Sequence, residues 1–330
     1  MKTLMPANSN KSDYVVGVDF GGTKIYAGLF TSNVSLVGTA KMTTKAIRGE
    51  AAVLDRIARC VRDVVDECDL TMDKIRAVGV GAPGVVDPET GRVIIAPNLD
   101  WRDVQFEKEL EKRLGVPVAV QNDANAALVG VYEEELASKP RHVIGIFVGT
   151  GIGGSLIING ELYSGYNHAA AEIGHMTIAL EGPKCGCGKI GCLEAFASRT
   201  AIYLKLKAAV EEGQKTLLTE MLGEKLDGLR SGDLRKAIQK GDKFVAKCIE
   251  DAAEHIGVAV GSLMNLLNPE VIVLGGGLIE ALSDVMMPRI TKVALAKALA
   301  GTEGVQIRDS MLGDKAGIYG AAILARRRTK

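Results

Sequence analysis

An apolar run close to the N-terminus is followed by two glycines and a second apolar run. Tyr14–Phe20 is the first run, Gly21 and Gly22 separate the two, and Ile25–Phe30 is the second. Short apolar runs rich in Val and Ile predict buried strands, and the glycines between them predict a tight turn. A further strand around Val34–Gly38 would complete a meander.

The same design returns in the middle of the chain. Val143–Val148 has the pattern of a buried strand, Gly149–Gly154 is rich in glycine, and Ser155–Ile158 continues as strand. This recurrence predicts an internal duplication. Each copy places backbone N–H groups at the end of a strand, where two such turns facing each other would form a clamp for phosphate.

Helical and strand patterns alternate along the rest of the chain, which predicts an α/β fold. Helices are predicted at residues 50–68, near Val104–Leu114, from Ala124, at Glu254–Leu267 and at Gly317–Arg327, and strands at Ile75–Gly81, Val118–Gln121 and Val271–Leu274. A third glycine turn, Gly275–Gly277, follows the last of these strands. Residues from Ala82 to Trp101 show neither period, and we expect an irregular segment there.

Length and charge limit the possible functions. With 330 residues, and about 150 residues per domain, we expect roughly two domains. Lys+Arg 40 balance Asp+Glu 40, which argues against a nucleic-acid or anionic-membrane partner. No apolar run reaches the roughly 18 residues of a membrane helix, and residues 1–13 contain no apolar signal core. We therefore expect a cytoplasmic protein in a reducing compartment, where disulfides are rare.

The sequence contains neither of two common phosphate-binding loops, the dinucleotide-binding loop and the Walker A loop. Gly149-x-Gly151-x-x-Gly154 matches the dinucleotide-binding fingerprint, but that fingerprint requires a helix directly after the glycines, and here a strand continues. A Walker A loop is absent, because Gly188-Lys189 has no glycine at the required upstream position. Phosphate would have to be bound by another arrangement.

Asp19-Phe-Gly-Gly-Thr-Lys24 offers such an arrangement. Its glycines let the backbone approach phosphate oxygens, Thr23 adds a hydroxyl and Lys24 adds positive charge. Asp19 could hold Mg²⁺ through water. The alternative is a hairpin turn with a solvated Asp and Lys, and the residues alone leave both interpretations open.

One imidazole and three thiols lie close together in the sequence, at His175, Cys185, Cys187 and Cys192. They form a complete ligand set for tetrahedral Zn²⁺, which a reducing compartment favours over a disulfide between Cys185 and Cys187. With all four positions taken by protein there is no place for water, so the zinc is predicted to be structural. It would fasten a loop that carries Glu172 and Glu194.

Two polar segments stay ambiguous from residue types alone. Asn122-Asp123 lies between a strand and a helix, where an Asp is more often an N-cap than a catalytic base. Pro97–Trp101 fits equally well as a polar loop anchored by Trp101 or as a ligand-binding segment that includes Asn98.

Five motifs in order resemble the ROK family of sugar kinases and repressors. They are Asp19-Phe-Gly-Gly-Thr-Lys24, Asn122-Asp-Ala-Asn125, Gly149-Thr-Gly-Ile-Gly-Gly154, Glu172-Ile-Gly-His175 and Cys185-Gly-Cys-Gly-Lys-Ile-Gly-Cys-Leu-Glu194. The resemblance covers nearly the whole chain and implies an α/β, two-lobed, duplicated actin/Hsp70/hexokinase-like (ribonuclease H-like) ATPase fold with a zinc-bound loop. One lobe would span residues 13–121, completed by a C-terminal helix at 315–330, and the other 122–314, with the active site in the cleft between them.

The resemblance also implies roles for individual residues. Asp123 would be the catalytic base, and His175 would serve both the zinc and the sugar. The sugar would be bound by Gly84, Asn98, Asn122, Asp123, Glu172, His175 and Glu194. ATP with Mg²⁺ would be bound by Asp19, Gly21, Gly22, Thr23, Lys24, Gly149, Thr150, Gly151, Gly153, Gly275, Gly276 and Gly277.

The activity implied by the resemblance is ATP-dependent phosphorylation of the 6-hydroxyl of glucose, because the loop around Gly84 is most similar to the glucokinase branch. An N-acetylhexosamine kinase is the alternative enzyme, since residue types do not settle whether an acetamido group fits. A sugar-sensing repressor is disfavoured, because about 13 residues precede the first strand and leave no space for a helix-turn-helix. The carboxylates of the zinc loop disfavour an ATPase switch without a sugar. The family is often dimeric, which implies a homodimer.

Overall fold

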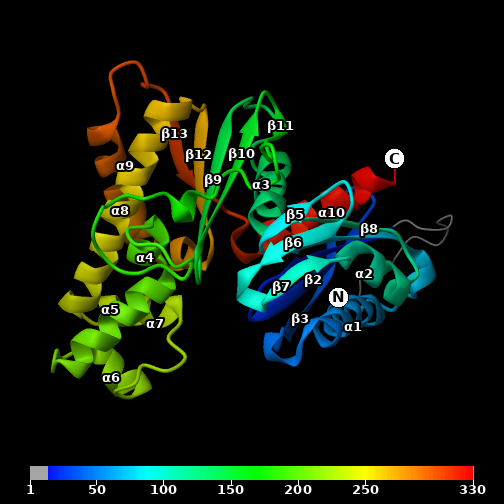
Figure 1. The fold of residues 1–330 in the computed structure, drawn as a ribbon, viewed down its shortest axis with the longest axis horizontal. Coiled ribbons are helices and arrows are strands. Elements are labelled where there is room, and N and C mark those ends of the chain that lie inside the picture. The colour runs from blue at the N-terminus through cyan, green and yellow to red at the C-terminus, as the bar shows by residue number, and fades with distance from the viewer. Residues whose placement is uncertain (1–13, 330) are drawn as a thin grey trace, which may run out of the picture. The chain divides into compact units, whose positions relative to one another are not determined.

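The computed structural model describes residues 14–329 and divides them into two compact units (Figure 1). Unit 1 contains the described residues up to Ala137, together with Ser164–Ala170 and the chain from Lys315 onward. Unit 2 contains Ser138–Tyr163 and Ala171–Asp314. The chain therefore passes from unit 1 into unit 2 and back again, and its C-terminal helix belongs to unit 1.

Unit 1 is built on a five-stranded sheet with the order β3-β2-β1-β4-β8. The strands are β1 (Tyr14–Phe20), β2 (Lys24–Thr31), β3 (Leu36–Thr43), β4 (Ile75–Ala82) and β8 (Val118–Asn122). β1, β2 and β3 form an antiparallel meander, whereas β1, β4 and β8 run parallel. The meander that the apolar runs predict is confirmed.

The main helices of unit 1 are α1 (Glu50–Asp66), α2 (Phe106–Leu114), α3 (Asp123–Glu134) and α10 (Ala316–Arg328), and short 3-10 turns lie at Ala46–Arg48, Met72–Lys74 and Pro97–Leu99. α10 lies directly on the sheet because two paired glycines leave room for it. A β-carbon at Gly17 would lie 1.9 Å from the carbonyl oxygen of Ile318, and one at Gly79 would lie 1.8 Å from that of Ala321. Side chains at these positions would force the helix off the strands.

A second, three-stranded sheet in unit 1 corrects the prediction of an irregular segment from Ala82 to Trp101. Its strands are β5 (Val85–Asp87), β6 (Arg92–Ala96) and β7 (Trp101–Val104). Strands of three to five residues are too short to display an alternation with a period of two. Trp101 anchors this sheet, since its ring packs 5.7 Å from that of Phe20 and 5.9 Å from that of Phe106.

Two predicted boundaries were also wrong. β3 begins at Leu36 instead of Val34, because Val34 has a positive φ of 61° and belongs to the turn before the strand. The helix expected from Glu254 begins eleven residues earlier, as α8 (Lys243–Leu267). Asp242 explains the start, since its side chain accepts hydrogen bonds from the N–H groups of Phe244 and Val245.

Unit 2 repeats the same plan in a five-stranded sheet with the order β11-β10-β9-β12-β13. The strands are β9 (Val143–Val148), β10 (Ile152–Ile158), β11 (Glu161–Leu162), β12 (Val271–Gly275) and β13 (Gln306–Asp309). β9 and β10 pair antiparallel across the glycine turn, and β9, β12 and β13 run parallel. The duplicated α/β sheet predicted from the sequence is confirmed, as is the rejection of a dinucleotide-binding loop, because β10 follows the glycines directly.

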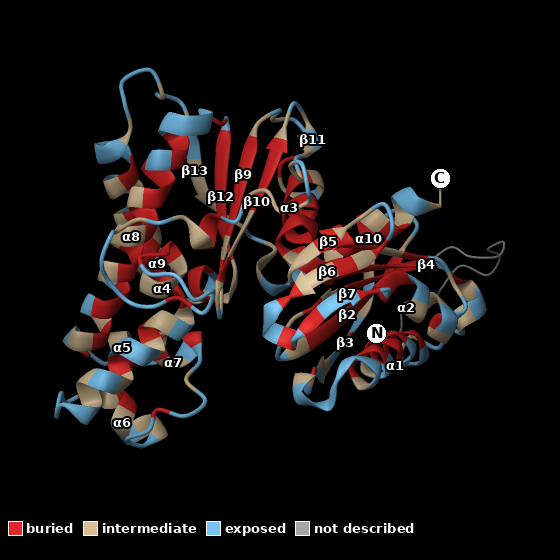
Figure 2. Cartoon of the chain, in the orientation of Figure 1, coloured by how far each residue is buried: buried red, intermediate tan, exposed pale blue. Residues whose placement is uncertain are grey.

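The helices of unit 2 are α4 (Leu193–Ala197), α5 (Arg199–Glu211), α6 (Leu217–Leu222), α7 (Ser231–Gln239), α8 and α9 (Gly277–Lys297), with 3-10 turns at Ile173–His175 and Gly313–Lys315. Figure 1 shows α8 and α9 side by side along the sheet of this unit. Each unit has its own buried core of strand and helix residues (Figure 2). Within residues 14–329, every helix falls short of the length or hydrophobicity needed to span a bilayer.

Candidate functional site

Several predicted site residues of unit 1, among them Asp19 and Asn122, lie at one edge of its five-stranded sheet. β1, β4 and β8 run parallel, so their carboxyl ends meet at the same edge. The register pairs Asp19 with Gly81 and Ala82 with Asn122. In sheets of this kind, ligands bind outside the carboxyl ends of the strands.

At the start of α3, position alone favoured Asp123 as the N-cap, but the structure places the cap one residue earlier. The N-cap is Asn122, whose Oδ1 accepts a hydrogen bond from the backbone N–H of Asn125 at 3.1 Å. Asp123 is the first helical residue, and its Oδ1 accepts from the N–H of Ala124 at 2.8 Å. The cap is therefore supplied by its neighbour, and the Asp123 carboxylate lies at the positive end of the helix dipole.

Gly84 connects Asn122 to the small sheet. The side-chain amide of Asn122 donates to the Gly84 carbonyl oxygen at 2.9 Å. Gly84 has a φ of 90°, and a β-carbon there would lie 2.1 Å from the carbonyl oxygen of Ile95 in β6. Asn98 lies in the 3-10 turn directly after β6 and is exposed. Gly84 and Asn122 are thus in direct contact.

Asp19 faces the beginning of α10. A β-carbon at Gly317 would lie 2.9 Å from the Asp19 carboxyl carbon, so only glycine allows the carboxylate this close to the first turn of the helix. A carboxylate at a helix N-terminus is electrostatically favourable. Sequence reasoning did not single out Gly317, because its role depends on a contact with a residue almost 300 positions away.

Thr44 forms two hydrogen bonds to carbonyl oxygens of the glycine turn of unit 1. The Thr44 hydroxyl donates to the Gly21 carbonyl oxygen at 2.6 Å, and the Thr44 backbone N–H donates to the Thr23 carbonyl oxygen at 3.0 Å. No described peptide bond is cis, so the N–H of each peptide points opposite to its carbonyl. The N–H groups of Gly22 and Lys24 are therefore turned away from Thr44.

The glycine turn of unit 2 has the same construction with different residues. The carbonyl oxygen of Gly149 accepts the backbone N–H of Arg199 at 2.9 Å, and that of Thr150 accepts the hydroxyl of Thr200 at 2.7 Å. By the same peptide geometry, the N–H groups of Thr150 and Gly151 point away from α5. Gly153 lies just beyond, in β10, paired with Phe147 of β9.

The third glycine turn lies beside the second. Gly275 pairs with Phe147, and a β-carbon at Gly276 would lie 2.6 Å from the carbonyl oxygen of Val148 at the end of β9. Gly277 is the first residue of α9. The structure therefore brings the turns Gly149–Gly154 and Gly275–Gly277 together at the carboxyl edge of the unit 2 sheet.

The four predicted metal ligands form one cluster, with their ligand atoms all within 4.8 Å of one another. Cys187 Sγ lies 3.7 Å from Cys192 Sγ, and Cys185 Sγ lies 3.6 Å from His175 Nδ1. In a tetrahedral zinc site, two thiolates are about 3.8 Å apart and a thiolate and an imidazole nitrogen about 3.6 Å apart, from bond lengths of about 2.3 and 2.05 Å. The cluster therefore fits a structural zinc ion.

The thiols of this cluster differ in acidity before any metal binds. Burial raises the pKa of Cys185 to about 12 and also raises the pKa of Cys192. The backbone N–H of Lys189 lowers the pKa of Cys187. Zinc binds thiolates, so its attraction for them must overcome the cost of burying their charge.

The two carboxylates of the zinc loop have different surroundings. Glu194 Oε2 accepts the backbone N–H of Ile152 at 2.8 Å, and its Oε1 accepts the Cys185 thiol at 3.7 Å. Glu172 remains open to solvent, but the protein packed around its carboxyl raises its pKa, and the charge of Glu194 raises it further against the opposing effect of His175. Glu194 thus joins the metal cluster to the glycine turn, whereas Glu172 is exposed beside it.

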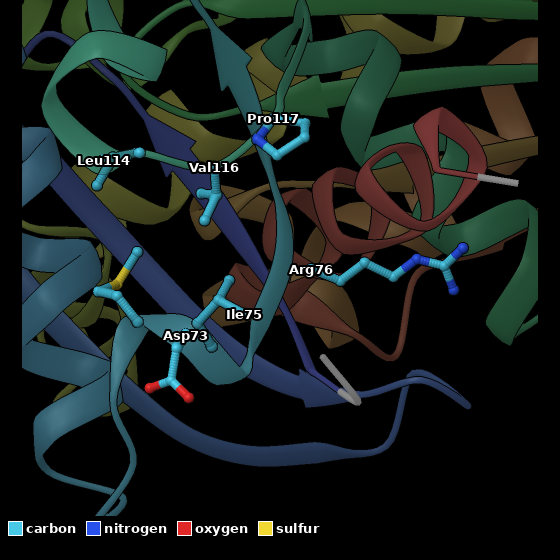
Figure 3. Close-up of a pocket in the computed structure, with 8 residues that line it drawn as sticks. Asp73, Ile75, Arg76, Leu114, Val116 and Pro117 are labelled. Atoms are coloured by element: carbon cyan, nitrogen blue, oxygen red, sulfur yellow. The ribbon is translucent and has the colours of Figure 1, made fainter. Parts of the chain in front are cut away.

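The structure also forms a pocket of about 390 Å³ in unit 1 that contains none of the predicted site residues (Figure 3). Its lining includes Ile75 at the start of β4 and Val116 and Pro117 just before β8. It therefore lies at the amino edge of the parallel strands, opposite the edge where Asp19 and Asn122 gather.

Besides Gly317, sequence reasoning missed three supporting residues: Thr44, Arg199 and Thr200. Thr44 follows a strand in a run of polar residues, where nothing marks it as buried. Arg199 and Thr200 follow Ser198, the N-cap of α5, so a capping signal was present. The sequence did not indicate that this helix begins against a glycine turn about 50 residues earlier.

Two related α/β units with a glycine turn at the same place in each sheet, one of them also holding a His/Cys cluster, define an actin- and hexokinase-like fold with a zinc site. The chain belongs to the ROK family, whose model matches residues 15–328.

Comparison with known proteins gives relatives that match over nearly their full length. The chain is 35% identical to a glucokinase from Streptomyces coelicolor, covering 94% of this chain and 97% of the relative. An N-acetyl-D-glucosamine kinase from Vibrio atlanticus is 30% identical, with 93% and 98% covered. The crystal structure of a ROK family glucokinase from Streptomyces griseus, in complex with glucose and AMPPNP, superposes with a TM-score of 0.84 at 34% identity, covering 95% of this chain and 99% of that one.

Proposed function

We propose that this ROK protein is a glucokinase that transfers the γ-phosphoryl group of MgATP to the 6-hydroxyl of glucose. One observation carries the proposal: the glycine turns and the Asn122-Asp123 pair lie at the carboxyl edges of the two sheets, where folds of this kind bind ligands, and Glu194 connects the metal cluster to one of these turns. The similarity to glucokinases supports it, and so does the relative that binds glucose and AMPPNP.

Asp123 is the proposed base. As O6 of the sugar forms its bond to the γ-phosphorus, the bond from that phosphorus to the β,γ-bridging oxygen breaks and ADP leaves. Asp123 takes the O6 proton, because the hydroxyl becomes acidic only as it attacks. The N-terminus of α3 places the positive end of a helix dipole beside the carboxylate, and the N–H of Ala124 orients it, which suits an acceptor of this proton.

The nucleotide is proposed to lie on the glycine turns. Gly21, Gly22 and Thr23 of unit 1, and Gly149, Thr150, Gly151 and Gly153 of unit 2, present backbone donors to the phosphates, with Gly275, Gly276 and Gly277 bordering the nucleoside. Asp19 and Lys24 complete the set. When bound, Mg²⁺ neutralises phosphate charge, and Asp19 is the carboxylate that would hold it through water.

The sugar is proposed to be bound by groups from both units. Gly84, Asn98 and Asn122 belong to unit 1, and Glu172, His175 and Glu194 belong to unit 2. His175, Cys185, Cys187 and Cys192 would hold the zinc, whose four protein ligands leave its role structural. The zinc would thereby fix the loop on which the sugar carboxylates stand.

The test is ADP release with MgATP across glucose, mannose, fructose, N-acetylglucosamine and N-acetylmannosamine. We expect turnover with glucose and a loss of about a hundredfold or more in kcat for Asp123→Asn, the usual contribution of a general base. Asp66→Asn is the matched control, because Asp66 is an exposed carboxylate at the end of α1 in the same unit.

An N-acetylhexosamine kinase is the second candidate, favoured by the 30% identity to the Vibrio atlanticus enzyme. Preference for an acetamido sugar in the same panel would replace glucose by that sugar and leave the proposed chemistry in place. Zinc-loaded protein that turns over with none of the five sugars would contradict the kinase proposal.

A further inference from the structure

Arg199 reaches the glycine turn of unit 2 from the first position of α5. Its Nη2 donates to the Thr150 hydroxyl oxygen at 2.7 Å, while its backbone N–H binds the Gly149 carbonyl oxygen. Arg199 is partly exposed and Thr150 is exposed, so both side chains are accessible to a ligand. The cationic side chain of Arg199 therefore contacts the turn that is proposed to bind phosphate.

The positive charge of Arg199 lies at an electrostatically unfavourable position in the fold. It begins a helix, where the dipole is positive and a cation is unfavourable, and the first turn of α5 contains no acidic residue. Among residues 14–329, no carboxylate forms an ion pair with its guanidinium. A bound anion would relieve this repulsion.

The hydrogen bonds of Thr150 and Arg199 also leave donors for an anion. Because the Thr150 oxygen accepts from Arg199, the hydroxyl proton is directed to another acceptor. The guanidinium has five N–H donors and one contact to the turn. The first two backbone N–H groups of α5 are bound to the carbonyls of Gly149 and Thr150, so the side chains carry the unused donors.

We propose that Arg199 is a phosphate-binding residue, which contacts the terminal phosphates of ATP together with the Thr150 hydroxyl. The inference rests on the proposed function, since it takes the ligand of the glycine turn to be a nucleotide. Arginine suits the role because its planar, permanently charged group matches the oxygens of a phosphate.

The test measures binding of Mg²⁺-AMPPNP and of adenosine by calorimetry, together with KM values for ATP and glucose, in zinc-loaded protein. Arg199→Ala should weaken AMPPNP binding about tenfold to hundredfold, as loss of a charged hydrogen bond does, and leave adenosine affinity and the KM for glucose within about twofold. Arg199→Lys keeps the charge and should recover part of the loss. Lys207→Ala, about two turns along the same helix, is the control and should bind like the wild type.

The outcomes separate this inference from the proposed function. Unchanged AMPPNP affinity in Arg199→Ala overturns the inference, and so does an equal loss of adenosine affinity, which would mean that Arg199 only braces the turn. A wild-type protein that binds AMPPNP through Arg199 but phosphorylates no sugar upholds the inference and refutes the kinase. A wild-type protein that binds no nucleotide refutes both.

Discussion

The side chain of Glu194 and the backbone N–H of Ile152 are joined by a hydrogen bond of 2.8 Å. Glu194 follows the last zinc ligand by two residues, and Ile152 is the first residue of β10 after the glycine turn. The bond therefore links the proposed sugar-binding loop to the proposed phosphate-binding turn within one unit.

This link predicts that Glu194 affects both substrates. Glu194→Ala should raise the KM for glucose about tenfold or more and the KM for ATP about threefold to tenfold, because the turn loses an anchoring hydrogen bond to a charged group. Glu172→Gln, which lacks such a bond to the turn, should raise only the KM for glucose. A Glu194→Ala enzyme with an unchanged KM for ATP would contradict the link.

Thr44 should support nucleotide binding without touching the nucleotide. Thr44→Val removes the hydroxyl that binds the Gly21 carbonyl in a fully buried position, which costs about 1–3 kcal/mol of folding stability and loosens the turn. We expect a raised KM for ATP with little change in the KM for glucose. Thr44→Ser keeps the hydroxyl and is the control. Thermal unfolding measures the loss of stability in both variants, and steady-state kinetics measure the two KM values. An unchanged KM for ATP in Thr44→Val would contradict the prediction.

Removal of zinc should weaken sugar binding before it unfolds the protein. Cys187→Ser takes one ligand from the cluster and should lower zinc content, the melting temperature and glucose affinity together, since the metal fixes the loop of Glu172 and Glu194. Cys68→Ser lies outside the cluster and should retain about one zinc per chain. Full glucose affinity in Cys187→Ser protein shown by metal analysis to be zinc-free would exclude this role.

Asp242 predicts a specific dependence of stability on pH. Burial opposes its ionisation, but hydrogen bonds from Thr216 and from the backbone N–H groups of Val245, Leu217 and Phe244 outweigh burial and lower its pKa. A carboxylate whose folded pKa lies below the unfolded value of about 3.9 stabilises the fold above that pH. Its contribution disappears as pH falls through the folded pKa.

Asp242→Asn should therefore unfold more easily than the wild type at pH 7, by about 1–2 kcal/mol, and the difference should shrink below about pH 4. Denaturant unfolding at several pH values measures this difference. Asp227→Asn, at an exposed position of the same unit, should follow the wild type throughout. A difference that stays constant from pH 7 to pH 3 would exclude the ionic role of Asp242.

The sequence was most informative where a pattern is local. Tyr14–Phe20 and Val143–Val148 predict their strands because continuous apolar runs bounded by glycine leave few alternatives. The His175 and Cys cluster was predictable because zinc ligands are few and chemically distinctive. The family motifs then extended these local observations to the whole duplicated fold.

Features that depend on contacts between distant segments could not be predicted. The three short strands between Val85 and Val104 gain stability from packing by Trp101 and Phe106, which their own pattern does not show. Asn122 caps α3 in place of Asp123, because two adjacent residues were both good caps and only the backbone geometry distinguishes them. Thr44 binds the turn at Gly21, and Arg199 binds the turn at Thr150, and in both cases the two partners are far apart in the sequence.

Gly17 and Gly79 leave a place on β1 and β4 that only α10 fills, although the ribosome makes α10 after all of unit 2. During synthesis, the part of the unit 1 sheet that α10 covers therefore stays uncovered while more than 140 intervening residues of unit 2, Ala171–Asp314, are made. Its completion is a late event that requires the finished chain. A ribosome that stalls within unit 2 would release a first unit with an exposed sheet face, a form suited to recognition by chaperones or proteases.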